Sequence, residues 1–356
     1  MTHSDNSSVC ILRLTALGDC INAFGIANAI HEDYPKVKIK WIIDSRFSSL
    51  FISDGKPIVP MAPVEIKKQG LLKSVLCLRK ELKGEQYDVL LNMQTSIKAS
   101  LLSTAVRAKQ KYGYDSERSR EGQSFFVNRR IDKPQTPHVM SGFISFARTA
   151  GFKNIEPKWD YHLTPQEINR AKELIPQDKK ILILAPASAK AEKNWTAEGY
   201  TEIGQYAVEK GFHVVIVGGK GSLETELCSG IADKLQNNCT NLCGKTSLRL
   251  LAAVISQASV VISPDSASMH LASSLNIPVI GLFAIHNPDR VGAWNFRKYE
   301  VSVYAQMAAA ELGNREAGWR YRVKNKEAMK AIDCQKVKEV FDRICNDYSL
   351  HRECKI

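Results

Sequence analysis

A short polar turn follows an apolar run near residue 263, and it is the first place where the sequence offers chemistry. The stretch SPDSASMHLASS occupies residues 263–274, directly after the apolar residues 258–262. Asp265 and Ser266 are typical of a helix start, where free backbone N–H groups and the helix dipole attract anions. His270 lies one helical turn after Ser266 and can share its face. The pattern indicates either an ordinary capped helix or a phosphate site.

Three further stretches also follow apolar runs: TALGD at 15–19, APASAKAEKNW at 185–195 and VGGKGSLETE at 217–226. In open parallel sheets, ligands bind beyond the carboxyl ends of the strands. The first turn has one glycine where a dinucleotide fingerprint needs three. The pair Gly219-Lys220 lacks the leading Gly and the following Ser or Thr of a P-loop. We therefore expect neither an NAD enzyme nor a conventional ATPase.

The elements that must position these turns alternate between strand and helix. In the first half, apolar runs at 9–14, 38–43 and 87–92 predict strands. The segments 21–32 and 143–150 predict helices. This alternation is typical of a parallel sheet covered by helices.

The alternation stops over residues 152–163, which show no clear period, and then restarts. Thr164, Pro165 and Glu167 have the spacing of a capping box at a helix start. Further strands are predicted at 180–184, 212–217, 259–262 and 278–283, and further helices at 196–210, 222–236, 246–256, 266–275 and 334–348. We therefore expect two doubly wound α/β domains, 1–163 and 164–330, followed by a C-terminal helix and tail at 331–356.

Length and composition agree with a globular protein of two domains. The chain has 356 residues, of which 44% are hydrophobic and 24% charged. No apolar stretch is long enough to span a membrane, and the polar start lacks the features of a signal peptide. Nine cysteines without a C-x-x-C pair are typical of reduced thiols. These features favour the cytoplasm.

The charge is positive and unevenly distributed. The formal net charge is +12, and residues 1–163 hold 24 of the 49 Lys and Arg residues but only 16 of the 37 Asp and Glu residues. Such an excess favours anionic partners: nucleic acid, an acidic membrane surface or a phosphorylated substrate. Nucleic acid is disfavoured, because the chain has no run of five basic residues and no DNA- or RNA-binding motif.

Five blocks of the sequence together resemble the lipopolysaccharide heptosyltransferases, glycosyltransferase family 9. They read TALGDCINAFGIANAI, MQTSIKAS, YGYDSERSREGQSFF, APASAKAEKNW and SPDSASMHLASSLNIPVIGLFAIHNPDRVGAWN. The resemblance implies a GT-B fold, with two Rossmann-like domains facing a cleft. It also implies transfer of a heptose from ADP-heptose to the lipopolysaccharide inner core or lipid A precursor, with inversion at the sugar carbon. The N-terminal domain would hold the acceptor and the C-terminal domain the sugar nucleotide.

The resemblance assigns donor-binding residues to the second domain. Lys193 matches the family's phosphate-binding lysine, and Glu224 matches the acidic residue that holds the ribose, with Glu226 as an alternative. Ser188 falls where hydroxyl residues approach the phosphates, whereas Ala189 beside it departs from that pattern. The remaining expected donor contacts are Asp265, Ser266, Ala267 and His270.

In the first domain the resemblance makes Asp19 the base that takes the acceptor hydroxyl proton. Considered alone, Asp19 equally suits a cap for a helix that starts at Ile21. Lys98, Arg118 and Arg120 match the basic residues on the acceptor side, where they suit carboxylates and phosphates of the inner core.

No Asp-x-Asp motif occurs, so we expect a metal-independent reaction without a cofactor, in which Lys193 and helix amides meet the charge of the leaving group. Ala284, Ile285 and His286 stand where relatives often have Gly-Pro-Thr, which leaves the identity of the donor open. The alternatives are another GT-B sugar-nucleotide enzyme, such as an epimerase, a hydrolase or a transferase with a different donor, or a non-catalytic member that binds nucleotide or lipopolysaccharide. The expected location is the cytoplasmic face of the inner membrane, in peripheral contact with it.

Overall fold

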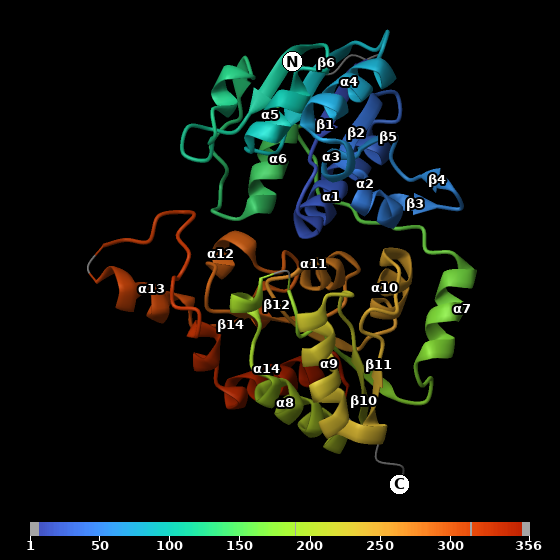
Figure 1. Ribbon diagram of the computed structural model, residues 1–356, viewed down its shortest axis with the longest axis vertical. Helices are drawn as coiled ribbons and strands as arrows, with labels where there is room; N and C mark the ends of the chain where they lie inside the picture. The colour runs from blue at the N-terminus through green and yellow to red at the C-terminus, as the bar shows by residue number, and fades with distance from the viewer. Residues whose placement is uncertain (1–6, 189, 314, 351–356) are drawn as a thin grey trace. The chain divides into compact units, whose positions relative to one another are not determined.

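The computed structural model describes residues 7–188, 190–313 and 315–350, and the chain divides into two compact units (Figure 1). The first unit ends at His162 and the second begins at Leu163. The division falls one residue before the one expected from the sequence. The C-terminal helix groups with the second unit.

Six parallel strands form the sheet of the first unit, in the order β5-β2-β1-β6-β7-β8. The strand order reverses between β1 and β6, and loops diverge at such a switch point. The loops that lead to α1, which carries Asp19, and to α5, which carries Lys98, both leave the sheet there. The strands are β1 (Ser8–Leu12), β2 (Lys38–Asp44), β5 (Met61–Val64), β6 (Tyr87–Asn92), β7 (Ala108–Gly113) and β8 (Arg129–Arg130), and β3 (Ile52–Ser53) and β4 (Lys56–Pro57) form a separate hairpin.

Helices cover both faces of this sheet, because its strands are apolar on both sides. On one face α4 packs against α5, over a core that contains Cys10, Leu12, Leu78 and Leu102. On the other face α1 packs against α6. The helices are α1 (Leu17–Asp33), α2 (Ser45–Ser48), α3 (Ile66–Gln69), α4 (Leu71–Glu81), α5 (Ile97–Ser103) and α6 (Val139–Thr149).

The segment without periodicity, 152–163, packs on α1 as an extended strap. The Trp159 ring nitrogen donates to the Ile21 carbonyl at 2.7 Å, and the Lys158 N–H donates to the Gly25 carbonyl at 2.9 Å. Tyr161 is buried beside Phe24. Contacts of single aromatic side chains hold this segment, which explains why it shows neither helical nor strand periodicity.

The second unit repeats the plan of the first, with six parallel strands in the order β11-β10-β9-β12-β13-β14. The order reverses between β9 and β12, so the loops that carry Lys193 and Asp265 leave at neighbouring strand ends. The predicted class of two doubly wound α/β domains is confirmed. The strands are β9 (Lys180–Leu184), β10 (Phe212–Ile216), β11 (Cys239–Asn241), β12 (Val260–Pro264), β13 (Val279–Phe283) and β14 (Val301–Ser302).

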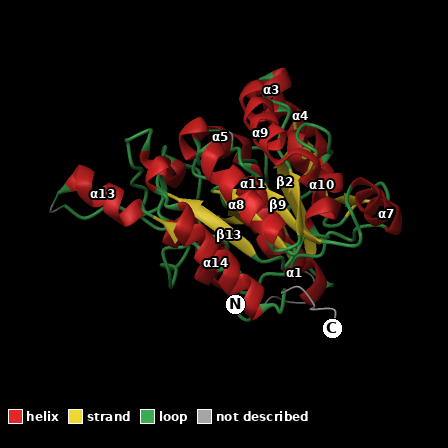
Figure 2. Ribbon diagram, turned by 90° about the horizontal axis from the view of Figure 1, so that it is seen from below, coloured by secondary structure: helices red, strands yellow, loops and turns green. Residues whose placement is uncertain are grey.

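Helices lie on both sides of these strands, which are yellow in Figure 2. Helix α8 packs with α9 and α14, whereas α10 packs with α7 and α11. The helices are α7 (Pro165–Leu174), α8 (Ala197–Glu209), α9 (Ser222–Leu235), α10 (Leu248–Ile255), α11 (Ala267–Ser274), α12 (Pro288–Val291), α13 (Tyr304–Leu312) and α14 (Cys334–Asp347).

The predicted capping box opens α7. The Glu167 N–H donates to the Thr164 hydroxyl at 3.2 Å, and the Thr164 N–H donates to the Glu167 carboxylate at 2.9 Å. Arg249 of α10 donates to the same carboxylate at 2.7 Å. This contact connects α7, the first helix of the second unit, to α10, one of the helices that cover its sheet.

Among the described helices, none combines the length and the apolar character that crossing a bilayer requires. The eight described cysteines form no disulfide with one another, and five of them are buried.

The packing of segment 152–163 on α1 predicts that Gly25 cannot be replaced by a residue with a side chain. A Cβ atom at Gly25 would lie 2.5 Å from a ring carbon of Trp159. We expect Gly25→Ala to lower the free energy of unfolding by about 1–3 kcal/mol through overpacking. Urea unfolding followed by fluorescence measures this change.

The matched control is Gly230→Ala in α9, where an added Cβ has no neighbour within 4 Å. That change should stabilise the protein by about 0.5–1 kcal/mol, because alanine favours a helix interior over glycine. Equal stability of the Gly25→Ala variant and the parent would show that the strap does not pack on α1 as described.

Candidate functional site

In the second unit, a helix N-terminus stands open at the carboxyl end of β12. Helix α11 begins at Ala267, with Ser266 as its N-cap, close to the predicted start. The Ser266 hydroxyl lies 2.8 Å from the Ser263 hydroxyl and does not cap the helix. Within the described chain, no acceptor meets the backbone N–H groups of Ala267 and Ser268. These two amides are therefore available to an anion.

The Asp265 carboxylate, one residue before that N-cap, meets three side chains. Its Oδ2 lies 2.5 Å from His286 Nδ1 and 3.3 Å from Lys193 Nζ, and its Oδ1 lies 3.8 Å from His270 Nε2. Lys193 also donates to the backbone carbonyl of Asp265. The four side chains are at most 15% exposed. The predicted residues Lys193, Asp265 and His270 thus come together in one cluster.

The charges in this cluster explain its ionisation. Burial opposes ionisation of Asp265, but the contacts with His270 and His286 and the charge of Lys193 hold the pKa of Asp265 well below its usual range. Burial also lowers the pKa of His286, which outweighs the opposite effect of Asp265. Since an ionised carboxylate only accepts hydrogen bonds, the neutral His286 ring donates from Nδ1 to Oδ2.

His286 is a site residue that the sequence reasoning missed. The stretch Ala284 to His286 stood out only as a departure from the family pattern. In the structure it follows β13, the neighbour of β12, so His286 and Asp265 leave the sheet at adjacent strand ends. The Val323 N–H donates to the Ile285 carbonyl at 3.0 Å, and this bond holds the stretch in place. The strand order of the sheet is what shows that His286 and Asp265 are neighbours.

The loop after β9 presents Lys193 at the end of a short 3-10 helix, Ala191–Lys193. Ser188 shapes this loop: its hydroxyl donates to the Lys190 carbonyl at 2.8 Å, and its N–H donates to the Asn194 side chain at 2.8 Å. The Ser188 hydroxyl proton is therefore engaged within the loop. Ala189 lies outside the described residues.

Glu224 lies in the first turn of α9, close to the start of the helix predicted at 222–236. The carboxylate covers Gly219, where an added Cβ would lie 2.2 Å from a Glu224 oxygen. Gly219 thus leaves room for Glu224 to fold back over the loop after β10. Glu226, the alternative, is exposed.

In the first unit, Asp19 lies inside α1 and does not precede it. The expected helix start at Ile21 is wrong, because α1 begins at Leu17. Asp19 Oδ2 forms an ion pair with Arg13 and accepts the Ala16 N–H at 3.3 Å. Oδ1 has no hydrogen-bond partner among the described residues, and the side chain is 33% exposed. Asp19 therefore combines a fixed orientation with one open oxygen.

Arg13 was not predicted from the sequence. Burial lowers the pKa of its guanidinium, but the neighbouring Asp19 outweighs this and raises the pKa above its usual value. Arg13 also donates to the Met93 carbonyl at 2.5 Å, and its guanidinium lies 5.4 Å from the centre of the Phe143 ring. These contacts connect Asp19 to the loop after β6.

Two glutamines that the sequence did not mark hold the loops at this strand edge. Gln94 Oε1 accepts the N–H groups of Leu14 and Thr15 at 2.8 and 3.1 Å. Gln123 donates to the carbonyls of Asn92 and Gln94 at 2.9 and 3.2 Å. The loops after β1, β6 and β7 are therefore connected by side-chain amides.

The three predicted acceptor residues have different environments. Lys98 on α5 and Arg120 are exposed, and their loops meet because the Ile97 N–H donates to Glu121 at 2.9 Å. Arg118 is buried; it lies 3.5 Å from Asp115 and donates to the Thr136 carbonyl at 3.1 Å. The contacts of Arg118 with Asp115 and Thr136 hold the loop after β7. Contact between Arg118 and an acceptor stays a prediction.

Each unit thus presents a distinct chemistry at its switch point. The second offers a lysine, two amides and an ionised carboxylate, a set that suits a diphosphate and sugar hydroxyls. The first offers an oriented carboxylate with one oxygen open among the described residues, and it carries the exposed cations Lys98 and Arg120 on loops and helices that follow its strands. Within the described residues, no three His, Cys, Asp or Glu side chains gather closely enough to hold a metal ion.

Comparison with known proteins identifies similar chains. The profile of glycosyltransferase family 9 (heptosyltransferase) matches residues 75–319. The chain is 40% identical to the lipopolysaccharide core heptosyltransferase OpsX of Haemophilus influenzae, over 93% of this chain and 94% of that protein.

Two solved structures share the fold. A glycosyl transferase family 9 protein from Veillonella parvula has a TM-score of 0.77 at 17% identity, over 97% of this chain and 100% of that chain. E. coli heptosyltransferase WaaC with ADP-2-deoxy-2-fluoro heptose has a TM-score of 0.68 at 20% identity, over 94% and 99% of the two chains.

The lowered pKa of His286 predicts a specific pH dependence of stability. Below a pH of about 6.5 the unfolded chain takes up a proton at this histidine, whereas the folded protein resists it. The free energy of unfolding should therefore fall as the pH drops below this value, by at most about 1.4 kcal/mol per pH unit for one proton.

Urea unfolding of the parent and of His286→Gln between pH 7.5 and 5 measures this contribution. The variant should lose less stability than the parent on acidification, because glutamine cannot be protonated. The same slope in both proteins would show that His286 is not protected from protonation.

Proposed function

The chain belongs to glycosyltransferase family 9, the heptosyltransferases, and we propose that it transfers a heptose from ADP-heptose to the inner core of lipopolysaccharide or a lipid A precursor. The observation that carries the proposal is the cluster of Lys193 and Asp265 at the open N-terminus of α11. A structural relative, E. coli heptosyltransferase WaaC with ADP-2-deoxy-2-fluoro heptose, supports the same donor class.

The donor diphosphate would bind at the start of α11. The N–H groups of Ala267 and Ser268 and the small side chain of Ser266 permit close approach of phosphate oxygens. Lys193 has three N–H donors, of which Asp265 engages two, so one stays available for the diphosphate. Asp265 and His270 would face the sugar hydroxyls, and Glu224 would accept hydrogen bonds from the ribose.

Transfer would proceed by a single displacement. The acceptor hydroxyl oxygen forms a bond to the anomeric carbon of the heptose while the bond from that carbon to the diphosphate oxygen breaks. The hydroxyl proton passes to Asp19 Oδ1, and ADP leaves with the bonding electrons. Attack opposite the leaving group inverts the configuration at carbon. Lys193 and the α11 amides, with no metal ion, would stabilise the charge on ADP.

The acceptor would lie against the first unit. Its net charge of +8 and the exposed cations Lys98 and Arg120 suit the phosphates and carboxylates of the inner core. Arg118 would act through the loop that carries Arg120. Because this acceptor is attached to a lipid, the protein would work at the cytoplasmic face of the inner membrane.

The test of this function combines purified protein, ADP-heptose and a heptose-free core acceptor, with the product identified by mass spectrometry. An increase of one heptose in the acceptor mass supports the proposal. Consumption of the donor without any acceptor would indicate an epimerase or a hydrolase instead. An intact donor with every acceptor tested would indicate a non-catalytic binding protein.

The role of Asp19 predicts the behaviour of Asp19→Asn. Turnover should fall by about 10²–10⁴-fold, because the amide cannot accept the proton, while ADP affinity stays at the parent value. Steady-state kinetics and calorimetry measure the two quantities. Asp54→Asn, which alters an exposed loop carboxylate, is the control and should keep full turnover. Near-normal turnover of Asp19→Asn would refute the base assignment.

The role of Lys193 predicts weaker nucleotide binding by Lys193→Ala. The loss of a charged hydrogen bond to phosphate should raise the Kd for ADP by about 10–100-fold. Calorimetry tests this, with Lys190→Ala, an exposed lysine of the same loop, as the matched control. If both variants bind ADP as the parent does, the diphosphate site lies elsewhere.

A further inference from the structure

Helix α4 exposes two leucines that the fold does not use. Leu72 is 81% and Leu76 64% exposed, although leucine is normally buried. They lie four residues apart, on one side of the helix. The opposite side buries Ser74 and Leu78 against the core of the first unit. Leu72 and Leu76 thus form a second apolar patch, on the side of α4 that faces away from the core.

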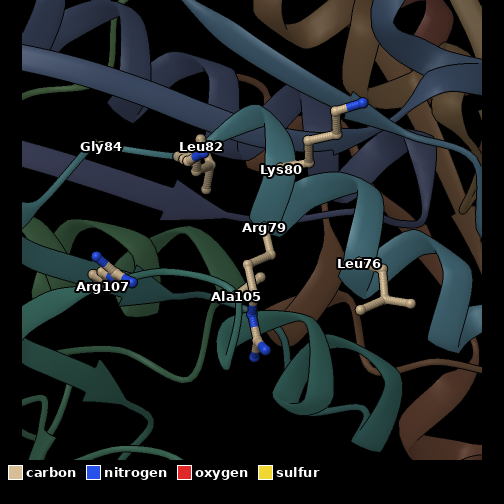
Figure 3. A pocket seen from close by; sticks show the side chains of 8 residues that line it. Leu76, Arg79, Lys80, Leu82, Gly84, Ala105 and Arg107 are labelled. Carbon is tan, nitrogen blue, oxygen red and sulfur yellow. The ribbon is translucent and has the colours of Figure 1, made fainter.

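Cations surround these leucines. Arg79 and Lys80 follow Leu76 at helical spacing, and Lys83 continues the same side after the helix ends. Arg107 joins them from the loop after α5. Together with Leu76 they line a hollow of about 330 Å³, whose floor includes Leu82 and Ala105 (Figure 3). No acidic residue lines this hollow.

The side chains of these four cations have no partner among the described residues. In the described ranges, no carboxylate forms an ion pair with Arg79, Lys80, Lys83 or Arg107. Residues 66–83 contain six basic residues and one acidic residue, Glu81. The charged groups that act on the Glu81 carboxylate are Lys40 and Glu85, and neither of them lines the hollow. The positive charge of this side of α4 therefore faces solvent.

Exposed leucines beside unpaired cations match the chemistry of an anionic membrane surface. Lipid phosphates attract the Lys and Arg side chains, and the leucines enter the boundary between headgroups and acyl chains. A soluble anion would have no use for the leucines. A second copy of the same face would bring like charges together.

We propose that the outward side of α4, formed by Leu72, Leu76, Arg79, Lys80 and Lys83 together with Arg107, binds the surface of an anionic phospholipid bilayer. The proposal rests on the proposed function, in which a lipid-attached acceptor places the enzyme at a membrane. It adds the surface that makes the contact and the class of lipid that it recognises.

The test measures flotation of the full-length protein with vesicles of phosphatidylcholine alone or with 40% phosphatidylglycerol. The parent should float with the anionic vesicles only, and 0.5 M salt should reduce this binding. Leu72→Ser/Leu76→Ser and Arg79→Gln/Lys80→Gln/Lys83→Gln should each lower the bound fraction at least 10-fold. All five positions are exposed, so the variants should fold as the parent does.

Matched controls separate this side of α4 from general charge and hydrophobicity. Leu223→Ser removes an exposed leucine of the second unit, and Lys172→Gln/Lys179→Gln/Lys326→Gln removes three exposed lysines there. Both should float as the parent does. Equal flotation of the α4 variants and the parent would overturn the proposal, as would binding of the parent to neutral vesicles or a change in oligomeric state in the α4 variants.

A second readout distinguishes this proposal from the proposed function. Heptose transfer to a delipidated, water-soluble core acceptor without vesicles should be unchanged in both α4 variants. A loss of that activity would assign this side of α4 to acceptor binding and overturn the membrane role. If the parent itself transfers no heptose but floats as expected, the proposed function fails while the membrane contact stands.

Discussion

The contacts of the buried Asp265 carboxylate are the interaction on which the candidate site of the second unit depends. It joins the ends of three neighbouring strands, because Lys193 follows β9, Asp265 follows β12 and His286 follows β13. Buried together, these groups satisfy one another's charge and hydrogen bonds, which a lone buried carboxylate could not achieve. The same contacts hold Lys193 beside Asp265, two residues before the first open amide of α11, so the groups that stabilise the buried carboxylate also place a lysine near this helix start.

The first unit also holds a carboxylate in a fixed orientation, but with other partners. Arg13 orients Asp19 by engaging only Oδ2, which leaves Oδ1 open among the described residues. Gln94 and Gln123 then fix the surrounding loops through backbone groups. As the proposed base, Asp19 would therefore be placed precisely, because its support is rigid.

The sequence predicted most of the architecture, because buried parallel strands are continuous apolar runs; β2, β6, β9 and β13 match their predicted ranges to within a residue. It missed β5, an edge strand whose Pro63 obscures the pattern, and β7, whose lysines do the same although it lies between β6 and β8. It started α1 four residues late, because Gly18 weakens the helical signal. Asp265 and His270 were singled out because they follow an apolar run at a helix start, and Lys193 through the family motifs. His286, Arg13 and the glutamines were not, because their partners are distant in sequence and become neighbours only through strand order.

The most direct test is a crystal structure of the protein with ADP. We expect the diphosphate within hydrogen-bond distance of the Ala267 and Ser268 amides and of Lys193 Nζ, with the His286 to Asp265 contact retained. A diphosphate bound away from α11, or Lys193 still directed only at Asp265, would contradict the proposed donor site.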